Sequence, residues 1–462
     1  MTEHHRAGPL FTDLYELTMA ASYFANKVFD VATFSLYIRD VYATRNYFVA
    51  AGLEQVLDEL AAFQFSDPDI SYLRSTGRFS EHFLDYLRQL RFTGDVYAMP
   101  EGTVFFANEP VMEVTAPIVE AQLIETFVLN TIGFQTMIAS KAARCFHAAA
   151  GRTLIDFSLR RTQGQDAGIK VARSTFIAGF VATSNVLAGK IYGIPISGTM
   201  AHSYVSAFDN ERDAFFAYAD TFPDHSIFLI DTYDSVEGAR HAAAVAKEMQ
   251  KKGHTLVGVR LDSGDMAGLS REVRKILDDA GLFDVQIFAS SGFDEFKIEK
   301  ILSEGAKIDA FGVGTKVGVS ADAPFVDVVY KMVRFKGQDK RKLSPGKITL
   351  AGAKQVFRKS DPAGRYIEDI IGLRQERIEE GEPLLEKVME NGKPIRSHPT
   401  LQTLRKRFEI NFSRLDKKYK SIRTTATYPV KLSRRLKDLQ ERVKINSRLD
   451  PETRTKSLDT HA

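Results

Sequence analysis

The sequence predicts an α/β protein in which a parallel α/β barrel follows an N-terminal α+β domain. The chain has 462 residues, which is too long for one ordinary domain and sufficient for two. From Thr153 onward, short apolar strand patterns alternate with helical patterns at a spacing of roughly 30 residues, the length of a βαβ unit. No dinucleotide-binding fingerprint follows the first of these strands. This combination favours a closed or nearly closed parallel barrel over an open sheet.

Three segments are expected along the chain. Residues 1–117 carry helical patterns followed by short strand patterns without βα alternation, which predicts the α+β domain. Residues 118–335 form the barrel domain, and residues 336–462 form a C-terminal extension with extended parts and a basic helical tail. The barrel strands are expected at 153–157, 194–197, 227–230, 255–259, 285–289, 308–311 and 326–335, and the helices between them at 165–182, 201–221, 235–251, 266–280 and 294–303.

Composition excludes several classes of protein. Apolar residues make up 44% of the chain, charged residues 26%, and the net charge is +3, so no global field indicates a nucleic-acid or membrane partner. No apolar run approaches the ~20 residues of a membrane span, and the N-terminus lacks the apolar region of a signal peptide. Cys145 is the only cysteine, which rules out an intrachain disulfide and suits a reducing cytoplasm.

The C-terminal tail departs from this even balance. Residues 401–462 hold 17 Lys and Arg against 7 Asp and Glu. A solvated helical face is the favoured interpretation, and a polyanion partner is the alternative.

Polar groups follow six of the expected barrel strands. In a parallel α/β barrel, catalytic residues come from the C-terminal ends of the strands, so these groups are expected on one face. An isolated Asp after a strand is usually a helix cap, but six polar strand ends together favour a binding site. The groups are Asp156 with Arg160 and Arg161, Thr199 with His202, Asp231 with Asp234, Arg260 with Asp262 and Asp265, Ser291 with Gly292, and Gly312 with Gly314 and Thr315.

These residue types suit one kind of ligand. The two glycine-rich turns suit a phosphate bound by backbone N–H groups. The three arginines suit a polyanion or a carboxylate. Asp231, Asp262 and Asp265 suit ribose hydroxyls or Mg²⁺, and the sequence does not choose among them as metal ligands. A sugar phosphate that carries a leaving diphosphate would use all of these groups.

His202 needs its own explanation. It follows Ile194–Ser197 and Gly198, a strand and turn pattern, and is expected in the first turn of a helix. A packed helix-N-terminal histidine is the simpler interpretation. A neutral imidazole is also a competent phosphoryl acceptor near pH 7, and phosphate-binding groups surround it. Asp231, Asp234 or Glu237 could orient the ring.

Six motifs in order resemble the nicotinate phosphoribosyltransferase family and cover about Pro9 to Val333. They are Thr12-Asp-Leu-Tyr-Glu-Leu-Thr-Met19, Phe157-Ser-Leu-Arg-Arg-x-Gln-Gly164, Thr183-Ser-Asn-Val-Leu-Ala-Gly189, Gly198-Thr-Met-Ala-His-Ser203, Arg260-Leu-Asp-Ser-Gly-Asp265 and Phe311-Gly-Val-Gly-Thr315. The resemblance implies transfer of phosphoribosyl from 5-phosphoribosyl-1-diphosphate (PRPP) to nicotinate in NAD biosynthesis, giving nicotinate mononucleotide and diphosphate with coupled ATP hydrolysis. It also implies the irregular barrel of the type II phosphoribosyltransferases.

The resemblance assigns roles to single residues. It implies that His202 is phosphorylated and that sites are shared in a homodimer. Because the transfer passes through a cationic sugar, nearby carboxylates should lower the barrier, and Asp262 and Asp231 are the catalytic candidates. Mg²⁺ is expected, ATP is a co-substrate, and no organic prosthetic group is expected. Nicotinate contacts map onto Tyr15 of the other subunit, Thr199 and Arg260. Phosphoribosyl contacts map onto Arg160, Asp262, Ser291, Gly292, Gly314 and Thr315. The strand-end groups add Arg161, Asp265 and Gly312 as candidate residues for binding PRPP and phosphate.

Three other functions compete with this one. A nicotinamide phosphoribosyltransferase is expected to carry an acidic residue near Ser184 and Asn185, where this sequence has none. A quinolinate-type decarboxylating enzyme would need more cationic residues and no such histidine. A catalytically inactive barrel could act as a binding protein through its basic tail, but the intact set of strand-end groups argues against it.

Overall fold

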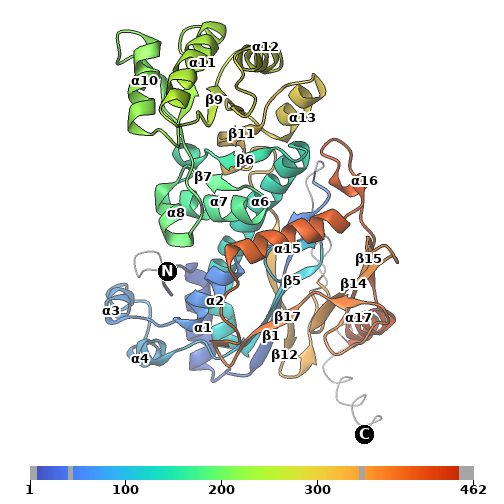
Figure 1. Ribbon diagram of the computed structural model, residues 1–462. Coiled ribbons are helices and arrows are strands. Elements are labelled where there is room, and N and C mark those ends of the chain that lie inside the picture. Colours follow the sequence, from blue (N-terminus) through green and yellow to red (C-terminus); the bar gives the residue numbers. More distant parts are fainter. Residues whose placement is uncertain (1–7, 40–44, 343–348, 447–462) are drawn as a thin grey trace. The chain divides into compact units, whose positions relative to one another are not determined.

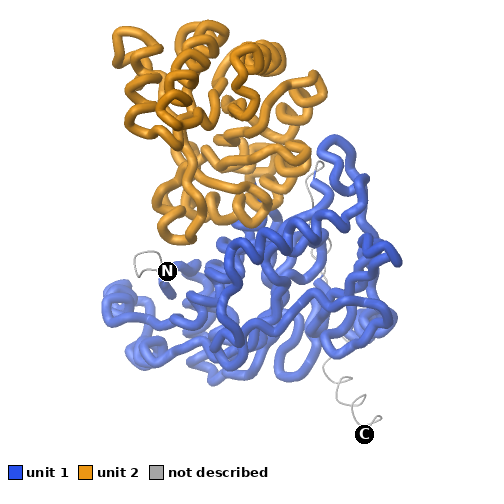
Figure 2. Tube along the Cα trace, viewed as in Figure 1, with its two compact units in different colours: residues 1–137, 325–462 blue, residues 138–324 orange. Residues whose placement is uncertain are grey.

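The structure is a computed structural model that describes residues 8–39, 45–342 and 349–446, and it divides into two compact units (Figures 1 and 2). Unit 1 comprises residues 1–137 and 325–462, and unit 2 comprises residues 138–324. These limits differ from the expected domain boundaries at 117 and 335. The segment after Lys336, expected as a separate extension, folds together with the N-terminal part; residues 447–462 of the basic tail lie outside the described residues.

A seven-stranded sheet organises unit 1. One of its inner strands, β1, is buried along nearly its whole length. In spatial order the strands are β13 (Gln338–Asp339), β12 (Val328–Phe335), β1 (Val31–Ile38), β5 (Pro110–Pro117), β3 (Asp95–Ala98), β17 (Glu386–Glu390) and β18 (Lys393–Pro394). Because β12 pairs antiparallel with β1, the strand predicted to end the barrel belongs to unit 1.

The C-terminal part completes unit 1 with a second sheet, in the order β16 (Glu382–Pro383), β14 (Lys354–Ser360), β15 (Tyr366–Leu373) and β19 (Val430–Leu432). A small pair joins β2 (Phe48–Val49) and β4 (Val104–Phe105). The helices are α1 (Leu14–Ala25), α2 (Leu53–Ala61), α3 (Asp67–Ser75), α4 (Glu81–Gln89), α5 (Ile118–Leu123), α15 (Leu401–Arg414), α16 (Lys417–Lys420) and α17 (Arg434–Asn446). The expected surface helices of the tail each bury one apolar face, for example Phe408 and Leu436.

Unit 2 contains six parallel strands in one open sheet. Their order is β7 (Ala182–Thr183), β6 (Thr153–Asp156), β11 (Ala310–Val313), β10 (Gln286–Ala289), β9 (Gly258–Leu261) and β8 (Ile227–Leu229). Among the described residues β7 and β8 are the edge strands, so the sheet forms a half-barrel and the expected closed barrel is not confirmed. The helices after α6 in unit 2 are α7 (Gln165–Ile177), α8 (Val186–Tyr192), α9 (His202–Val205), α10 (Glu211–Thr221), α11 (Ser235–Lys251), α12 (Met266–Asp279), α13 (Glu295–Ser303) and α14 (Thr315–Gly318). Figure 1 labels all of these except α9 and α14.

Two expected elements of unit 2 differ from the structure. Residues 194–197 form no named strand and make only a single parallel bridge, between Ile196 and Thr183. The edge strand in this region is β7, which the sequence placed at the end of a helix. The helix expected at 201–221 is interrupted by Ser206–Asn210, so His202 begins a helix of only one turn.

Helix α6 (Glu125–Ala148) carries two buried cations that anchor α13. Lys141 Nζ lies 2.6 Å from Glu295 Oε2, and Arg144 Nε lies 2.7 Å from Glu295 Oε1. Lys141 also lies 2.7 Å from Asp322 Oδ1. A buried carboxylate requires such pairing, because removing one partner would leave an uncompensated charge in a medium of low dielectric. No described helix is long and apolar enough to cross a membrane.

Candidate active site

The carboxyl ends of the parallel strands of unit 2 meet at one edge of the sheet. β9 pairs in register with β10 and β8, and β11 pairs with β10 and β6. Parallel pairing places the loops that follow these strands side by side. The loops after β6, β8, β9, β10 and β11 therefore form one polar surface, as the sequence predicted.

Arg260 projects from β9 into this surface. Its Nη1 donates to Thr199 Oγ1, which brings together two residues that are 61 positions apart in sequence. Its Nε is buried and has no hydrogen-bond partner among the described residues. Burial lowers the pKa of Arg260, and the nearby charges of Asp262 and Asp231 partly offset that effect. The guanidinium therefore keeps an unused donor at the site.

The carboxylates of Asp231 and Asp262 connect three strand ends. Asp231 Oδ2 accepts hydrogen bonds from Asp262 N at 2.9 Å and Ser263 Oγ at 2.6 Å. Asp262 Oδ1 in turn accepts from Ser290 Oγ, the first residue after β10. Asp231 Oδ1 is buried without a partner in the described part of the chain. Both carboxylates are thus held by hydrogen bonds, and Asp231 keeps one oxygen without a partner among the described residues.

His202 is held by a residue that the sequence did not single out. Its Nδ1 lies 3.1 Å from Thr232 Oγ1, and its Nε2 lies 3.9 Å from Asp262 Oδ2. None of the three expected orienting acids takes this role. Asp231 binds the β9 loop, Asp234 caps α11 through the N–H groups of residues 236 and 237, and Glu237 pairs with Arg240. The ring remains 46% exposed, open to a ligand.

The loop after β10 has the backbone shape that the glycine-rich prediction requires. Ser291 has φ of 102° and Gly292 has φ of 63°, so two consecutive residues adopt left-handed conformations. Lys297 Nζ donates to Ser291 O at 2.6 Å and holds the loop in this shape. A non-glycine residue at positive φ costs about 1–3 kcal/mol, so the surrounding contacts have to hold Ser291 in this conformation.

The loop after β11 is shaped by close packing on Phe157. A Cβ at Gly312 would lie 2.3 Å from the Phe157 ring, and a Cβ at Gly314 would lie 3.2 Å from Phe157 O. Gly312 is thus required by packing, while Gly314 leads into α14, whose first residue is the exposed Thr315. The two glycines, assigned together from sequence, therefore have different structural constraints.

Two lysines beside these loops were missed by the sequence analysis. Lys297 lies on α13, and its pKa is lowered by burial and by the neighbouring charge of Lys316. Lys316 Nζ lies 2.7 Å from Asp294 Oδ2, and Asp294 Oδ1 caps α13 through Lys297 N at 2.9 Å. Their positions in the sequence could have indicated them: Lys297 is three residues after Asp294, and Lys316 follows Thr315. Lysines are so frequent on helices, however, that this spacing is not distinctive.

Arg160 and Arg161 lie in the short 3-10 helix η2 (Leu159–Arg161) after β6. Both side chains are exposed, and neither has a hydrogen bond or ion pair within residues 8–39, 45–342 and 349–446. Asp156, which precedes them, is buried and accepts from Ser158 Oγ at 2.5 Å and Thr183 Oγ1 at 2.7 Å. Asp156 therefore shapes the turn, while the two arginines remain available to an anion.

Asp265 is placed differently from the other two candidate metal ligands. Its carboxylate bends back over α12, where a Cβ at Gly268 would lie 2.3 Å from Asp265 Oδ2. The described ranges contain no group of three or more His, Cys, Asp or Glu side chains that could hold a metal ion. Asp231 and Asp262 alone share the strand-end network.

Tyr15 lies on α1 of unit 1, whereas the strand-end groups belong to unit 2. Its side chain is about half exposed, and burial together with Glu125 and Glu16 raises the pKa of its hydroxyl. A neutral phenol ring at the surface suits stacking on a flat ligand.

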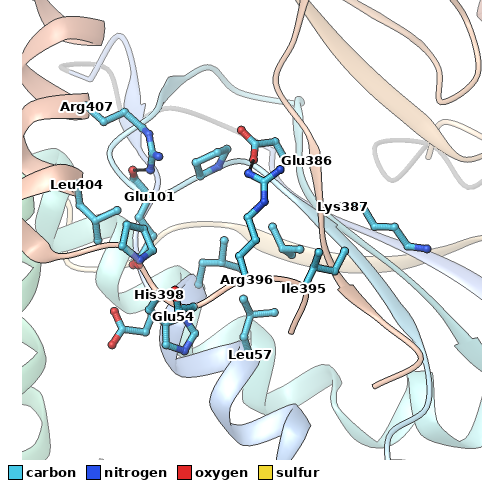
Figure 3. A pocket seen from close by; sticks show the side chains of 15 residues that line it. Glu54, Leu57, Glu101, Glu386, Lys387, Ile395, Arg396, His398, Leu404 and Arg407 are labelled. Carbon is cyan, nitrogen blue, oxygen red and sulfur yellow. Dashed lines mark hydrogen bonds and ion pairs between the residues drawn. The ribbon is translucent and has the colours of Figure 1, made fainter. Parts of the chain in front are cut away.

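A cavity of about 250 Å³ in unit 1 contains none of the predicted site residues (Figure 3). Its charged groups are largely paired: His398 Nε2 lies 2.7 Å from Asp58 Oδ1, and Arg407 Nη1 donates to Glu101 O at 2.9 Å. The remaining lining is mostly apolar, including Leu53, Leu57 and Leu404. Among the described residues, the lining of this cavity therefore holds no buried unpartnered donor comparable to Arg260 Nε.

Comparison with known proteins gives consistent matches along the chain. The family model for the nicotinate phosphoribosyltransferase N-terminal domain matches residues 10–133, the model for the family itself matches 153–342, and the model for its C-terminal domain matches 379–440. The C-terminal match lies beyond Val333, outside the part of the chain that the six sequence motifs cover.

Curated relatives and solved structures extend over almost the whole chain. Nicotinate phosphoribosyltransferase pncB2 of Mycobacterium tuberculosis is 47% identical, covering 94% of this chain and 94% of the relative. The Bacillus subtilis nicotinate phosphoribosyltransferase is 39% identical, with 92% of each chain covered. The crystal structure of human nicotinic acid phosphoribosyltransferase superposes with a TM-score of 0.84 at 30% identity, covering 94% of this chain and 99% of that one.

Proposed function

The chain belongs to the nicotinate phosphoribosyltransferase family and is a nicotinate phosphoribosyltransferase of NAD biosynthesis, and we propose that the strand-end surface of unit 2 is its active site. The enzyme joins nicotinate to the phosphoribosyl group of PRPP and releases diphosphate. The residues of the surface are assigned below by matching each part of these substrates to the groups that the structure places there.

The environment of Arg260 is the observation that supports this proposal most directly. Arg260 is half-buried, its Nε is buried without a hydrogen-bond partner among the described residues, and its Nη1 contacts Thr199, so its guanidinium can bind the carboxylate of nicotinate through charge-assisted hydrogen bonds. Leaving a buried donor unpaired costs about 1–3 kcal/mol, so the free enzyme favours a ligand that supplies an acceptor. Ser184 offers no acidic group to a nicotinamide amide, and Asn185 is occupied by Ala188 N and Gly168 O.

The phosphoribosyl group fits the loops after β6, β10 and β11. Ser291, Gly292 and Gly314 provide left-handed or open backbone for N–H contacts, and Thr315 is exposed beside them. Lys297 and Lys316 add positive charge that the sequence did not indicate. Arg160 and Arg161 have guanidinium groups without a hydrogen bond or ion pair in the described part of the chain, and the positive charge of Arg160 contributes to lowering the pKa of Arg260. We assign Arg160 and Arg161 to the diphosphate.

Phosphoribosyl transfer passes through a cationic, oxocarbenium-like sugar. Fixed carboxylates near that sugar lower the barrier because they are already oriented before the charge develops. Asp262 is fixed by Ser290, and Asp231 is fixed by the backbone of Asp262, so both meet this requirement. The pyridine nitrogen of nicotinate attacks with a free lone pair, so no side chain has to remove a proton, and positioning carries the remaining catalysis.

Mg²⁺ fits this set through Asp231 and Asp262. Asp231 Oδ1 is a buried oxygen without a partner in the described chain, and a hard cation binds such oxygens. When bound, Mg²⁺ would neutralise charge on the leaving diphosphate. Asp265, turned back over Gly268, is left out of this assignment.

His202 is assigned to ATP coupling. Its ring is exposed, Thr232 holds Nδ1, and Nε2 lies toward Asp262 at the centre of the surface. A phosphate on this imidazole would add negative charge and acceptors beside the substrate phosphates. The phosphorylated and free forms then differ in affinity for PRPP and diphosphate, which is how ATP hydrolysis can drive the synthesis.

A homodimer is the proposed assembly. Tyr15 is an exposed ring on α1 of unit 1, and the remaining nicotinate contacts lie in unit 2. In this proposal Tyr15 of one subunit stacks on the nicotinate bound by the other subunit.

Replacing Arg260 by Ala tests the carboxylate assignment. The loss of a charge-assisted pair, about 2–4 kcal/mol, should raise the apparent KM for nicotinate steeply in steady-state assays. The KM for nicotinamide should change much less, because no carboxylate is involved. Arg260→Lys should recover only part of the loss, since an ammonium cannot bind both carboxylate oxygens in a fork. Arg271→Ala, an exposed arginine on α12, is the matched control; an unchanged nicotinate KM in Arg260→Ala would remove Arg260 from this role.

Replacing His202 by Ala tests the ATP coupling. Incubation with ATP should leave an acid-labile, base-stable phosphate on the wild-type enzyme and none on His202→Ala. The variant should keep weak synthesis that ATP no longer stimulates, because the transfer chemistry does not pass through the imidazole. His254→Ala, an exposed histidine paired with Asp224, should behave as wild type. Full ATP stimulation in His202→Ala, or label on another residue, would contradict the assignment.

Mixing two inactive variants tests the shared site. Tyr15→Ala and Arg160→Ala subunits should each be impaired alone, and mixed dimers should regain about one good site each. Activity would be measured after subunit exchange has been confirmed with differently tagged subunits. If exchange occurs and activity does not return, Tyr15 acts within its own subunit or not at all.

A further inference from the structure

Unit 1 contains an arginine-lined cavity of about 430 Å³ that the proposed activity does not use. It lies against α17, with lining from β1, β5 and the residues around Gly352 and Leu373. Four of its side chains are arginines: Arg334, Arg374, Arg435 and Arg442. Two of these belong to the basic tail, for which the sequence left a polyanion partner as the alternative interpretation.

Helix α17 is fixed against the wall of this cavity. The Gln440 side chain makes two hydrogen bonds with the backbone of Ala351, accepting at 2.8 Å and donating at 3.1 Å. Leu436 is fully buried, and Leu439 packs so closely that a Cβ at Gly352 would lie 2.7 Å from it. These contacts hold the helix in one orientation. Arg435 and Arg442, seven positions apart and therefore on one face, both line the cavity as a result.

The arginines exceed the acids that could neutralise them. Arg435 and Arg442 have no hydrogen bond or ion pair in the part of the chain that the structure describes. The two acids of the lining are engaged: Asp339 lies 3.8 Å from Arg334, and Glu376 Oε2 accepts from Leu373 N and Ser433 Oγ. Among the side chains that line the cavity, four are arginines and two are acids, and Glu113, behind the lining, pairs with both Arg374 and Lys354.

Arg374 is held with one donor unused. Its Nη2 lies 2.6 Å from Glu113 Oε2, and its guanidinium stacks on the Tyr97 ring at 4.1 Å. Its Nε is buried and, among the described residues, has no hydrogen-bond partner. A rigid guanidinium with a free donor is pre-organised for an oxyanion, because little side-chain entropy is lost when the anion binds.

We propose that this cavity binds a small polyphosphate-bearing anion at a second site, distinct from the strand-end surface of unit 2. Its volume is that of a small-molecule pocket, and arginine forks match phosphate oxygens in pairs. A concave site of this size suits a compact ligand better than a nucleic-acid chain, whose contacts would spread over an open surface. The residues of the cavity are separate from those assigned to transfer, so the proposal does not depend on that assignment.

Calorimetric titration with inorganic triphosphate tests the second site, using full-length enzyme at low ionic strength. The wild type should show two binding components. Arg435→Ala with Arg442→Ala should weaken one component about tenfold or more while turnover of nicotinate and PRPP stays at its basal value. Arg160→Ala should weaken the other component and leave this one intact. Inorganic phosphate, with fewer oxygens, should bind the cavity more weakly than triphosphate.

Arg434→Ala with Lys437→Ala is the matched control, because it removes two positive charges from the same helix at positions that do not line the cavity. This variant should bind triphosphate as the wild type does. Equal loss in both double variants would show a diffuse charge effect and overturn the site, as would unchanged binding in Arg435→Ala with Arg442→Ala. Tighter binding of a short single-stranded oligonucleotide, weakened equally by both double variants, would instead assign the tail to a polymer surface.

Discussion

The carboxylate of Asp231 connects the ends of two neighbouring parallel strands, and the geometry of the site depends on that link. Asp231 stands after β8 and accepts from the backbone of Asp262 after β9. Asp262 accepts from Ser290 after β10, so one chain of hydrogen bonds crosses three loops. Such a network stabilises the site by more than the sum of its separate hydrogen bonds, because each member fixes the orientation of the next. Arg260, on the strand between these loops, is placed by the same constraint.

A second buried interaction supports the loops after β10 and β11. Glu295, the first residue of α13, is held between Lys141 and Arg144 of α6 and has no exposed surface. The residue before it, Asp294, binds Lys316 and caps the same helix. The positions of Ser291 and Lys297 therefore depend on charges buried several residues away. Buried pairs of this kind contribute more to a defined geometry than to net stability.

Local sequence patterns were sufficient for the positions of most strands and for the strand-end residues of unit 2. The βα spacing located β6, β8, β9, β10 and β11 to within a few residues. Local sequence patterns could not predict which strands pair with each other. The strand at 328–335 has the same apolar pattern whether it closes a barrel or, as the structure shows, pairs with β1 in another sheet. The open edge of the unit 2 sheet follows from that choice. The C-terminal part joins unit 1 through contacts such as β17 with β3, which join segments nearly 300 positions apart.

Local sequence patterns also could not predict most contacts between side chains of the site. Arg260 and Thr199 were grouped from motifs, and the structure shows their contact. The contacts of Thr232 with His202 and of Lys297 with Ser291 depend on side-chain rotamers and loop conformations. The spacing of residues in the sequence does not predict these. The three aspartates were equivalent in sequence, and only the fold separates Asp265 from the other two.

The central claim is that this site joins a carboxylate-bearing pyridine to phosphoribosyl and couples the reaction to ATP. The most direct measurement is product formation by the purified enzyme from PRPP and either nicotinate or nicotinamide, each with and without ATP, followed by chromatography of the mononucleotides. The account predicts nicotinate mononucleotide as the main product, more of it with ATP, and little product from nicotinamide. Equal use of nicotinamide, or no mononucleotide from either base, would contradict it.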